Sequence, residues 1–410
     1  MGNATATVAP LRKPTRRSIK AASRKTGQQK RREEALQRQQ AARQDFADYA
    51  RQLATSAGGS PAQPGSGDQD ASTSSRHDPW DTAVEGRAHT ALQAETSKQY
   101  YARQLMQPEW LTDIPADLCT NWYVMPRPEG RRCLVISSQH MTISRHRNGS
   151  MLHKFPSILP NGSRESSAGS GDDFCILDCV FHEAASVYYV LDMMCWKGYA
   201  LYDCSAEFRL FWVQSKLAEC LPGPGQQQQR YPFVPVPAFT CTQGGLQHAY
   251  SSPVPFQRDG LYFLHKEGHY SLDSTPLAVL WKDEACSQYC IDTDANGVVP
   301  ENQGITLEYR MDQTVATADT PPVVLGRMPA PFVQSMGPAL RPGKLLRFEI
   351  GPGGIQMHDG QPLGADLKYV GVANQRRGRA DACSKVLFQY MARRQPISFA
   401  EILDAADGST

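Results

Sequence analysis

The stretch FCILDCVFHEAASVYYVLDMMCWKGYALYDC, residues 174–204, decides the fold. It contains two apolar runs, 174–181 and 187–196, which are rich in Val, Tyr, Phe and Cys and are separated by the polar segment HEAAS. Runs of this length and composition, bounded by turn residues, are typical of β-strands. The second run includes Asp192 and is shorter than the ~20 apolar residues that a membrane-spanning helix needs. We therefore expect a soluble protein with a strand-rich body and no membrane partner.

The rest of the body combines more strand-like runs with one clear helical pattern. Strand-like runs lie at 122–125, 133–137, 261–265 and 277–281. Helical spacing over 205–220 is set by Phe208, Phe211, Trp212 and Leu217. Beyond residue 300, the segment 346–360 predicts a strand and a turn, and 381–394 predicts a final helix. The sequence thus indicates an α+β fold, with a body over 97–300 and a C-terminal extension of undefined role over 301–410.

The N-terminal segment has a different composition from the body. Residues 28–54 contain Ala, Gln, Arg, Glu and Leu without Gly or Pro, which predicts one long helix. Its narrow apolar stripe consists of Ala42, Phe46, Tyr49 and Leu53. Because the other faces are polar, we expect this helix to order on binding a partner rather than on its own domain. The segment 56–79 is rich in Gly, Ser, Pro and Asp, as in a flexible linker, so we divide this part into an arm (10–55) and a linker (56–96).

The charge is distributed unevenly along the chain. Residues 1–55 carry thirteen Lys and Arg against four Asp and Glu, while the whole chain carries 43 against 41. A basic arm before a mildly acidic body suggests an acidic partner for the arm, such as nucleic acid, a membrane surface or an acidic protein groove. The N-terminus has no apolar signal region and no myristoylation pattern, so neither secretion nor acylation is expected.

The cysteines favour a reducing compartment and a structural role. Eleven Cys are scattered through apparent strands, and the Cys175/Cys179 and Cys286/Cys290 pairs lack the spacing of common zinc modules. We interpret them as reduced core thiols rather than disulfides or metal ligands. No metal and no cofactor is expected.

Several stretches, taken in order, resemble the snurportin family, adaptors that import spliceosomal U snRNPs. They are QQKRREEALQRQQAARQDFADYARQLA (28–54), KQYYARQLMQPEWLTDIPADL (98–118) and the stretch 174–204, with FPSILPNG, DGLYFLHK and STPLAVLW between and after them. The resemblance covers about residues 10–55 and 97–283. It implies an importin-β-binding helix in the arm, and a trimethylguanosine-cap-binding domain over 97–300. That domain's fold would be similar to the nucleotidyltransferase fold of RNA guanylyltransferases and nucleic-acid ligases.

The resemblance also implies that this domain binds without catalysis. Nucleotidyltransferases of that fold attack the α-phosphate with the Lys of a K-x-D-G-x-R pattern, and the corresponding stretch here begins with Arg127 and ends with Arg132. A guanidinium with a pKa above about 12 cannot supply a nucleophile at neutral pH. We therefore expect no catalytic residue and no enzyme activity, and a turn that binds phosphate without reacting.

The three chemical parts of a trimethylguanosine cap require different residues. By resemblance, Trp281 stacks on the cationic base, which the cation–π attraction of an aromatic face favours. The triphosphate requires cations with bidentate geometry, and Arg131, Arg132 and Arg147 fall at or beside the positions that the family uses for it. Gln107 and Pro108 fall where the family lines the base edge. The full expected cap-binding set is Gln107, Pro108, Arg131, Arg132, Cys133, Arg147 and Trp281. Compared with the family pattern, this chain has one extra residue between STPL and the Trp, and a Gln-Pro pair in place of an apolar-Ser pair.

For the arm, importin-β receptors are acidic helical solenoids that can surround a basic helix. The expected contacts are Lys30, Arg31, Arg32, Arg38, Arg43 and Arg51. Together with the cap, this implies two partners, importin β and trimethylguanosine-capped U snRNA or snRNP, and shuttling between cytoplasm and nucleus. An export receptor is a further partner of the family, but 1–11 does not contain a leucine-rich export signal.

Other interpretations of the same residues remain open. Trp281 could be a core residue, Arg147 a solvated side chain, and the arm a solvated basic segment or a nonspecific RNA-binding tail. At the level of function, the alternatives are a nucleotidyltransferase-fold enzyme, such as an RNA guanylyltransferase or ligase, and a cap-binding RNA regulator without an import function.

Overall fold

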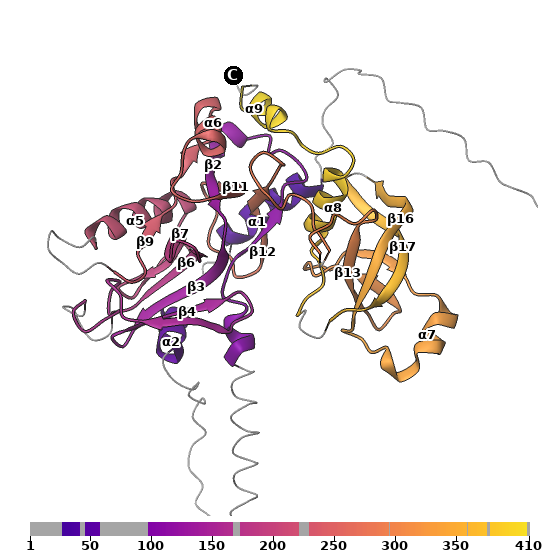
Figure 1. Ribbon diagram of the computed structural model, residues 1–410, viewed down its shortest axis with the longest axis horizontal. Helices are drawn as coiled ribbons and strands as arrows, with labels where there is room; N and C mark the ends of the chain where they lie inside the picture. The colour runs from indigo at the N-terminus through magenta and orange to yellow at the C-terminus, as the bar shows by residue number, and fades with distance from the viewer. Residues whose placement is uncertain are drawn as a thin grey trace, which may run out of the picture.

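The computed structural model describes residues 27–41, 46–57, 97–166, 173–220, 229–294, 296–358, 360–374 and 378–407. Figure 1 shows two sheets packed together on one side of the molecule and a smaller C-terminal domain on the other. In the described part of the chain, runs of consecutive strands, such as those over 122–200 and 258–327, are separated by single helices or pairs of helices. The predicted α+β fold is confirmed.

The body contains two sheets of largely antiparallel strands. The first sheet has the order β1(Gln107–Trp110), β12(Ser274–Trp281), β11(Arg258–His265), β2(Trp122–Pro128) and β10(Phe239–Thr240). The second sheet has the order β5(Met151–Phe155), β4(Met141–His146), β3(Arg131–Ser138), β6(Cys175–His182), β7(Val187–Trp196) and β8(Tyr199–Ala200), with β9(Phe233–Pro235) alongside β7. Only β1 with β12 and β7 with β9 pair in parallel among these described strands.

The two sheets face each other across the main hydrophobic core. Met125 and Tyr262 from the first sheet pack there against Leu134, Ile176 and Leu191 from the second. The outer face of the second sheet is also covered, by α5(Ala206–Glu219). Because β6 and β7 are buried on both faces, their sequences are almost continuously apolar and lack the alternation of half-exposed strands. Both predicted strands of the stretch 174–204 are therefore confirmed.

Helices complete the layers on the outside. The predicted helix over 205–220 is confirmed as α5, whose first turn is capped by Ser205, the hydroxyl accepting a hydrogen bond from the Phe208 amide. The outer face of the first sheet is covered by α4(Leu118–Asn121), α6(Gln243–Ser251) and α9(Phe399–Asp407). The last helix, α9, was not predicted, yet it buries Ile402 and Ala406 against this sheet.

The C-terminal segment forms a domain of its own around a third sheet. Its strands have the order β15(Val324–Arg327), β14(Thr314–Ala316), β13(Gly304–Tyr309), β16(Leu345–His358) and β17(Gln361–Val372), all antiparallel. The short helices α7(Ala330–Met336) and η1(Gly337–Ala339) lie between β15 and β16. The predicted strand over 346–360 is confirmed within β16, and the predicted final helix over 381–394 is confirmed as α8(Cys383–Ala392).

Helix α8 attaches this C-terminal domain to the body. Its Val386 is buried in the core of the third sheet, while its Phe388 is buried in the cluster on the outer face of the first sheet. One helix therefore contributes to two hydrophobic cores, and the space between the body and the C-terminal domain is bounded by α8.

The N-terminal arm differs from its prediction in two ways. The predicted single helix is instead α1(Gly27–Ala41) and α2(Ala47–Ala57), because Phe46 is not helical. The expectation that the apolar stripe packs on a partner rather than on its own domain is also wrong. Leu53 is fully buried in the main core, and Phe46 stacks on Tyr202 with ring centroids 4.8 Å apart. Since α2 ends at Ala57, it reaches into the predicted linker, while Ala42, Arg43 and the range 58–96 lie outside the described residues.

Candidate functional site

A cleft with a volume of about 1000 Å³ opens between the first sheet of the body and the C-terminal domain. The cleft is lined by cations from both sides. They are Arg127, Arg132, Arg147 and Lys282 from the body, and Arg379 and Lys385 from the C-terminal domain. The acidic residues on its walls are Asp273, Asp292, Glu308 and Asp381.

The turn between β2 and β3 brings two of these arginines into the cleft. Gly130 allows the turn, since its φ of 141° is rarely adopted by other residues and an added Cβ would lie 2.3 Å from the Phe181 carbonyl oxygen. Arg127 before it and Arg132 after it then both line the cleft. By resemblance, this stretch was expected to form a phosphate-binding turn. Its first and last residues, Arg127 and Arg132, thus lie in one site.

Arg132 is held rigidly by a buried acid. Its Nε and Nη2 atoms donate to the two carboxylate oxygens of Asp178 at 2.9 and 2.5 Å, a bidentate pair. Burial opposes the charge of Arg132, but the Asp178 carboxylate raises its pKa above the ordinary value. The Tyr270 hydroxyl donates to the same carboxylate at 2.8 Å. Arg132 is therefore charged and fixed in direction.

A second acid compensates another pair of cations. Asp259 accepts hydrogen bonds from Arg127 and from the Lys282 ammonium. Burial opposes ionisation of Asp259, but the charges of Arg127 and Lys282 lower its pKa below the ordinary value. Burial in turn lowers the pKa of Lys282, against the attraction of Asp259. These three groups form a paired unit with a net charge of +1 at the wall of the cleft.

Arg147, between β4 and β5, is in a different position. Its guanidinium donates to the Gln107 side-chain oxygen, a neutral partner. Desolvation, together with the positive charges of Arg132, Arg379 and Arg127, lowers the pKa of Arg147 to about 10. The positive charge of Arg147 is therefore opposed by these neighbours, and an anion bound in the cleft would relieve the repulsion. The predicted residues Gln107, Pro108, Arg132 and Arg147 are all brought together at this cleft.

The aromatic residues of the cleft differ from those expected. Trp281 is fully buried on the outer face of the first sheet, where its indole nitrogen donates to the Ile397 carbonyl at 2.9 Å. In this position the Trp281 ring has no exposed face for a base. Its place agrees with the alternative interpretation, in which Trp281 is a core residue. The neighbouring Leu280 lines the cleft instead. Successive side chains of a strand point to opposite faces, so the extra residue after STPL moves the Trp to the other side of β12.

Trp110 lies on the cleft face at the corresponding place. It is paired across β1 and β12 with Leu280, is half-buried, and lines the cleft. One side of its ring packs on Phe388, with centroids 4.7 Å apart, and the Lys282 ammonium lies 6.0 Å from its centroid. Trp110 therefore both packs against the hydrophobic cluster that contains Phe388 and lines the cleft.

The same alternation removes two more predicted residues from the cleft. On β3, Arg132 faces the cleft, whereas Arg131 and Cys133 point to the opposite face. Arg131 is exposed and pairs with Glu183 at 3.0 Å. Cys133 is fully buried in the cluster beneath α5, and burial raises the pKa of its thiol. Neither side chain lines the cleft.

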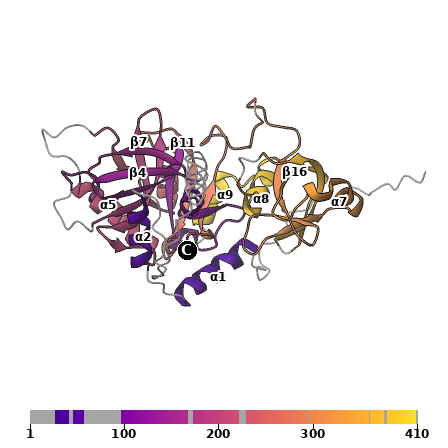
Figure 2. The same ribbon diagram turned by 90° about the horizontal axis from the view of Figure 1, so that it is seen from below.

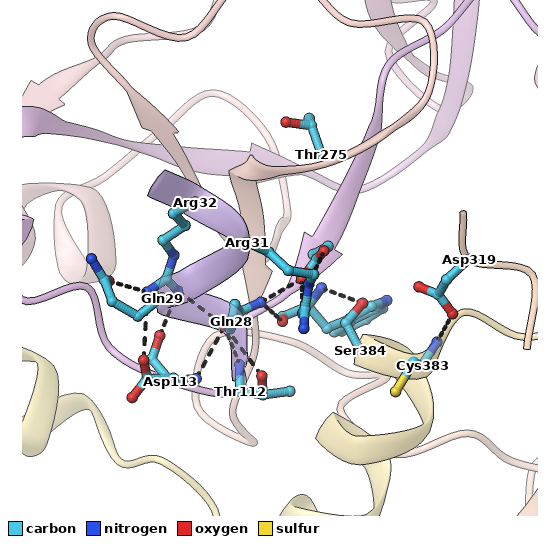
Figure 3. Close-up of polar contacts among 12 residues, drawn as sticks. Gln28, Gln29, Arg31, Arg32, Thr112, Asp113, Thr275, Asp319, Cys383 and Ser384 are labelled. Carbon is cyan, nitrogen blue, oxygen red and sulfur yellow. Dashed lines mark hydrogen bonds and ion pairs between the residues drawn. The ribbon is translucent and has the colours of Figure 1, made fainter. Parts of the chain in front are cut away.

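The predicted receptor-binding cations of the arm lie partly on the body, as Figure 3 shows. Arg31 donates from Nε and Nη2 to the two carboxylate oxygens of Glu109, at 3.0 and 2.6 Å. Arg32 is almost fully buried and donates to the Asp113 carbonyl at 2.6 Å and to the Gln28 side chain at 2.9 Å. By contrast, Lys30 and Arg51 are exposed and pair with nearby residues of their own helices, Glu34 and Asp48. Arg38 is also exposed, and Arg43 lies outside the described residues.

The described residues contain no helix long and apolar enough to cross a membrane. Within the same residues, no group of three or more His, Cys, Asp or Glu side chains is arranged to hold a metal ion. All eleven cysteines of the chain lie in the described residues and are free of disulfide bonds.

Among the solved structures that are similar to this chain are structures of DNA ligases. The ligase domain of M. tuberculosis LigD is 11% identical, covering 66% of this chain and 94% of its own, with a TM-score of 0.31. A structure of Lig E DNA ligases is 14% identical, covering 66% and 98%, with a TM-score of 0.30. A mycobacterial DNA ligase D complexed with ATP and MES is 11% identical, covering 67% and 97%, with a TM-score of 0.31. Likeness at this level carries no argument about function.

The comparison with protein families is more specific. Residues 104–283 match the family model described as Snurportin1, m3G cap-binding domain. The matched range contains β1, β12 and the turn of Arg127 and Arg132, which together form the body side of the cleft. The match supports a snurportin-like family for this chain.

Proposed function

We propose that this protein binds the trimethylguanosine cap of an RNA in the cleft between the body and the C-terminal domain. The observation that carries the proposal is the position of Arg147, whose neutral partner and three arginine neighbours make an anion favourable there. A cap presents a triphosphate bridge, and arginine binds phosphate bidentately. Arg127 and Arg132 line the same cleft and would contact the bridge beside Arg147.

The cationic base requires an aromatic face, and Trp110 offers one on the wall of the cleft. Its ring already lies within 6.0 Å of the Lys282 ammonium, so the site tolerates a positive charge near the ring. Base–aromatic stacking contributes roughly 1–3 kcal/mol, and a methylated, cationic base gains further from the cation–π attraction. Gln107 and Pro108, on the same strand, would line the edge of the base.

Titration with three cap dinucleotides tests this proposal. Binding to trimethylated, monomethylated and unmethylated dinucleotides is followed by intrinsic tryptophan fluorescence at fixed salt. The trimethylated cap is expected to bind most tightly and the unmethylated one most weakly. Equal binding of all three would refute recognition of the methylated base, and absence of binding would refute the proposal as a whole.

We further propose that the chain is an import adaptor that recruits importin β through its basic arm. The support is the resemblance of 28–54 to the import arm and the exposure of Lys30 and Arg38 on α1. Shuttling between cytoplasm and nucleus, with return by an export receptor, belongs to the same proposal. Since α2 is part of the main core, the arm that is available to a receptor ends before it.

Removal of residues 1–45 tests the import proposal without cutting into α2. The truncated protein is expected to bind the trimethylated cap but to lose nuclear delivery of a fluorescent capped RNA in permeabilised cells. Nuclear delivery that continues without residues 1–45 would refute the arm as the import element, and absence of delivery by the full-length protein would favour a cap-binding RNA regulator without import function.

We also propose that the protein is not an enzyme. Arg127 stands where the nucleotidyltransferase pattern has its nucleophilic Lys, and the two lysines that line the described cleft are both engaged in ion pairs. Lys282 binds Asp259, and Lys385 binds Asp292 at 2.6 Å. A nucleophilic amine has to be deprotonated, which these carboxylates oppose, although burial lowers the pKa of Lys282. Incubation with labelled GTP or ATP and divalent metal should leave no acid-labile nucleotide on the protein, and such an adduct would make the enzyme the better assignment.

A further inference from the structure

One exposed aromatic residue of the cleft has no part in the function proposed above. Tyr289 lines the cleft and is 57% exposed. In the described part of the chain, no other aromatic ring stacks on Tyr289, and its hydroxyl makes no hydrogen bond. The match to the cap-binding family ends at residue 283, so the matched residues do not account for this ring.

The loop that carries Tyr289 is anchored on both sides of the ring. Before Tyr289, the Ser287 hydroxyl donates to the Asp259 carboxylate at 2.6 Å. After it, the Cys290 carbonyl accepts from the Gln389 side chain at 3.0 Å. Gln389 belongs to α8, which lies between the body and the C-terminal domain in Figure 2. Because the backbone around Tyr289 is already fixed, a base that stacks on its ring would not have to order the loop.

The anchors of this loop lie away from Trp110 along the first sheet. Trp110 is on β1, at the edge of the sheet, and the next strands in order are β12, β11 and β2. The residues that flank Tyr289 bind the Lys282 carbonyl, directly after β12, and Asp259 on β11. Neighbouring strands are about 4.8 Å apart, so these anchors lie about 5 and 10 Å from β1. They lie toward β2, the strand of Arg127, and therefore on the side of the cleft where the phosphate-binding arginines begin.

A cap dinucleotide brings two bases into the cleft, and Trp110 can stack on only one of them. One side of the Trp110 ring packs on Phe388, so a single side is left for a base. The volume of about 1000 Å³ is at the upper end of the range of about 300 to 1000 Å³ for ligand pockets, which leaves room for a second nucleoside. The two bases of a cap lie at opposite ends of the triphosphate bridge. With the bridge on the arginines and one base on Trp110, Tyr289 is the exposed ring that remains for the other base.

We propose that Tyr289 stacks on the base of the first transcribed nucleotide, so that the cleft recognises the cap together with this nucleotide. The inference rests on the proposed cap binding and extends it to the second base. Every base has a face that can stack on an aromatic ring, so Tyr289 accepts any first nucleotide. Stacking is stronger for the larger purine rings, which gives a modest preference for a purine at this position.

The experiment compares ligands that have one base or two. The one-base ligand is trimethylguanosine triphosphate, and the two-base ligands are trimethylguanosine cap dinucleotides that end in adenosine or cytidine. Tyr289→Ala should weaken binding of the adenosine dinucleotide by about 5- to 30-fold, the lower part of the range for loss of a stacking ring. Its effect on trimethylguanosine triphosphate should stay below about twofold. The unmodified protein should prefer the adenosine dinucleotide over the cytidine one by about 2- to 5-fold, and Tyr289→Ala should lose this preference.

Two further variants complete the test. Tyr289→Phe keeps the ring and should bind all three ligands like the unmodified protein. Tyr199→Ala is the matched control, because Tyr199 is a 69% exposed tyrosine on β8 that does not line the cleft. It should change no affinity, and melting temperatures of all variants exclude unfolding as the cause.

Two results would overturn the inference while cap binding stands. One is an unchanged affinity of Tyr289→Ala for the adenosine dinucleotide. The other is an equal loss for trimethylguanosine triphosphate, which would place Tyr289 against the cap base or the bridge. If the unmodified protein binds none of the three ligands, the proposed function fails, and the inference fails with it.

Discussion

The contact between the arm and the body can be tested by changing a body residue that lies outside the arm. Glu109→Gln keeps the size of the side chain but removes the charge that Arg31 binds with two hydrogen bonds at 3.0 and 2.6 Å. Substitutions of Arg31 or Arg32 are less informative, because both are also expected receptor contacts. Changing Glu109 alters how firmly α1 is docked and leaves the arm sequence intact.

The size of the effect follows from the burial of the two partners. Hydrogen bonds to charged groups contribute roughly 1.5–3 kcal/mol when desolvated. The Glu109 side chain is 6% exposed, but Arg31 is 38% exposed, so solvent screens the pair. About 1–2 kcal/mol is a reasonable value, which corresponds to a 5- to 30-fold change in the docking equilibrium of α1. If α1 is docked in most molecules, the apparent affinity for a receptor that needs it free should rise by up to the same factor.

Two measurements check this expectation. Hydrogen exchange over 27–41 should become faster in Glu109→Gln, and binding to importin β should become tighter by up to 5- to 30-fold. Glu183→Gln is the matched control, since it breaks an exposed pair with Arg131 on the other side of the body. The reasoning would be refuted if Glu109→Gln and Glu183→Gln gave the same exchange over α1 as the unmodified protein. Faster exchange with unchanged receptor affinity would support the contact between α1 and Glu109. It would count against α1 as the receptor-binding element.

Three more predictions concern the cleft and its supports. Trp281→Ala should cost about 3–5 kcal/mol of stability with unchanged cap affinity per folded molecule, whereas Trp110→Ala should reduce the preference for methylated caps; calorimetry and cap titration distinguish the two. Arg131→Gln should leave cap affinity within about twofold, while Arg147→Gln should lose roughly tenfold or more, as measured by the same titration. The pKa of Asp259 is lowered in the folded protein. The ionised Asp259 therefore stabilises the fold fully above its unfolded pKa of about 4, and this stabilisation is lost as the pH falls through the lower folded pKa. Asp259→Asn should remove this part of the acid dependence of the melting temperature.

The elements that were predicted correctly are those whose signal is local. The two apolar runs of 174–204 form β6 and β7, and the helical spacing after Ser205 forms α5. A strand buried on both faces or a capped helix is encoded within its own segment. The α9 helix is amphipathic and short, with only Ile402 and Ala406 buried, so its signal over nine residues is weak.

The site residues were only partly predictable, because successive side chains of a strand alternate between its two faces. Only the residues on one of these faces line the cleft. Four of the seven expected residues gather there, while Arg131, Cys133 and Trp281 point to the other face of their strands. One residue more or less before a position exchanges the two faces of a strand. The extra residue after STPL was visible in the sequence, and its consequence for Trp281 follows from the two-residue period alone. Arg131 and Cys133 share a strand with Arg132 and differ from it by one position each.

The docking of the arm could not be predicted from the arm itself. Its contacts join residues about 80 positions apart in the sequence, such as Arg31 with Glu109, and its composition is that of a solvated helix. What decides the outcome is the body. Strand β1 is at the edge of the first sheet, and an open strand edge has unpaired amide and carbonyl groups.

Side chains from the two ends of the chain satisfy that edge. The Trp110 carbonyl accepts from the Gln28 side chain at 2.9 Å, and the Trp110 amide donates to the Ser384 hydroxyl at 3.1 Å. Glu109, on the opposite face from the cleft, receives Arg31 and the Gln28 amide, while Pro108 and Trp110 line the cleft. A four-residue strand is therefore in contact with the arm, the C-terminal helix α8 and the ligand site at once. Any ligand that shifts β1 changes the free energy of arm docking, and by linkage a docked arm changes the affinity for that ligand by the same factor.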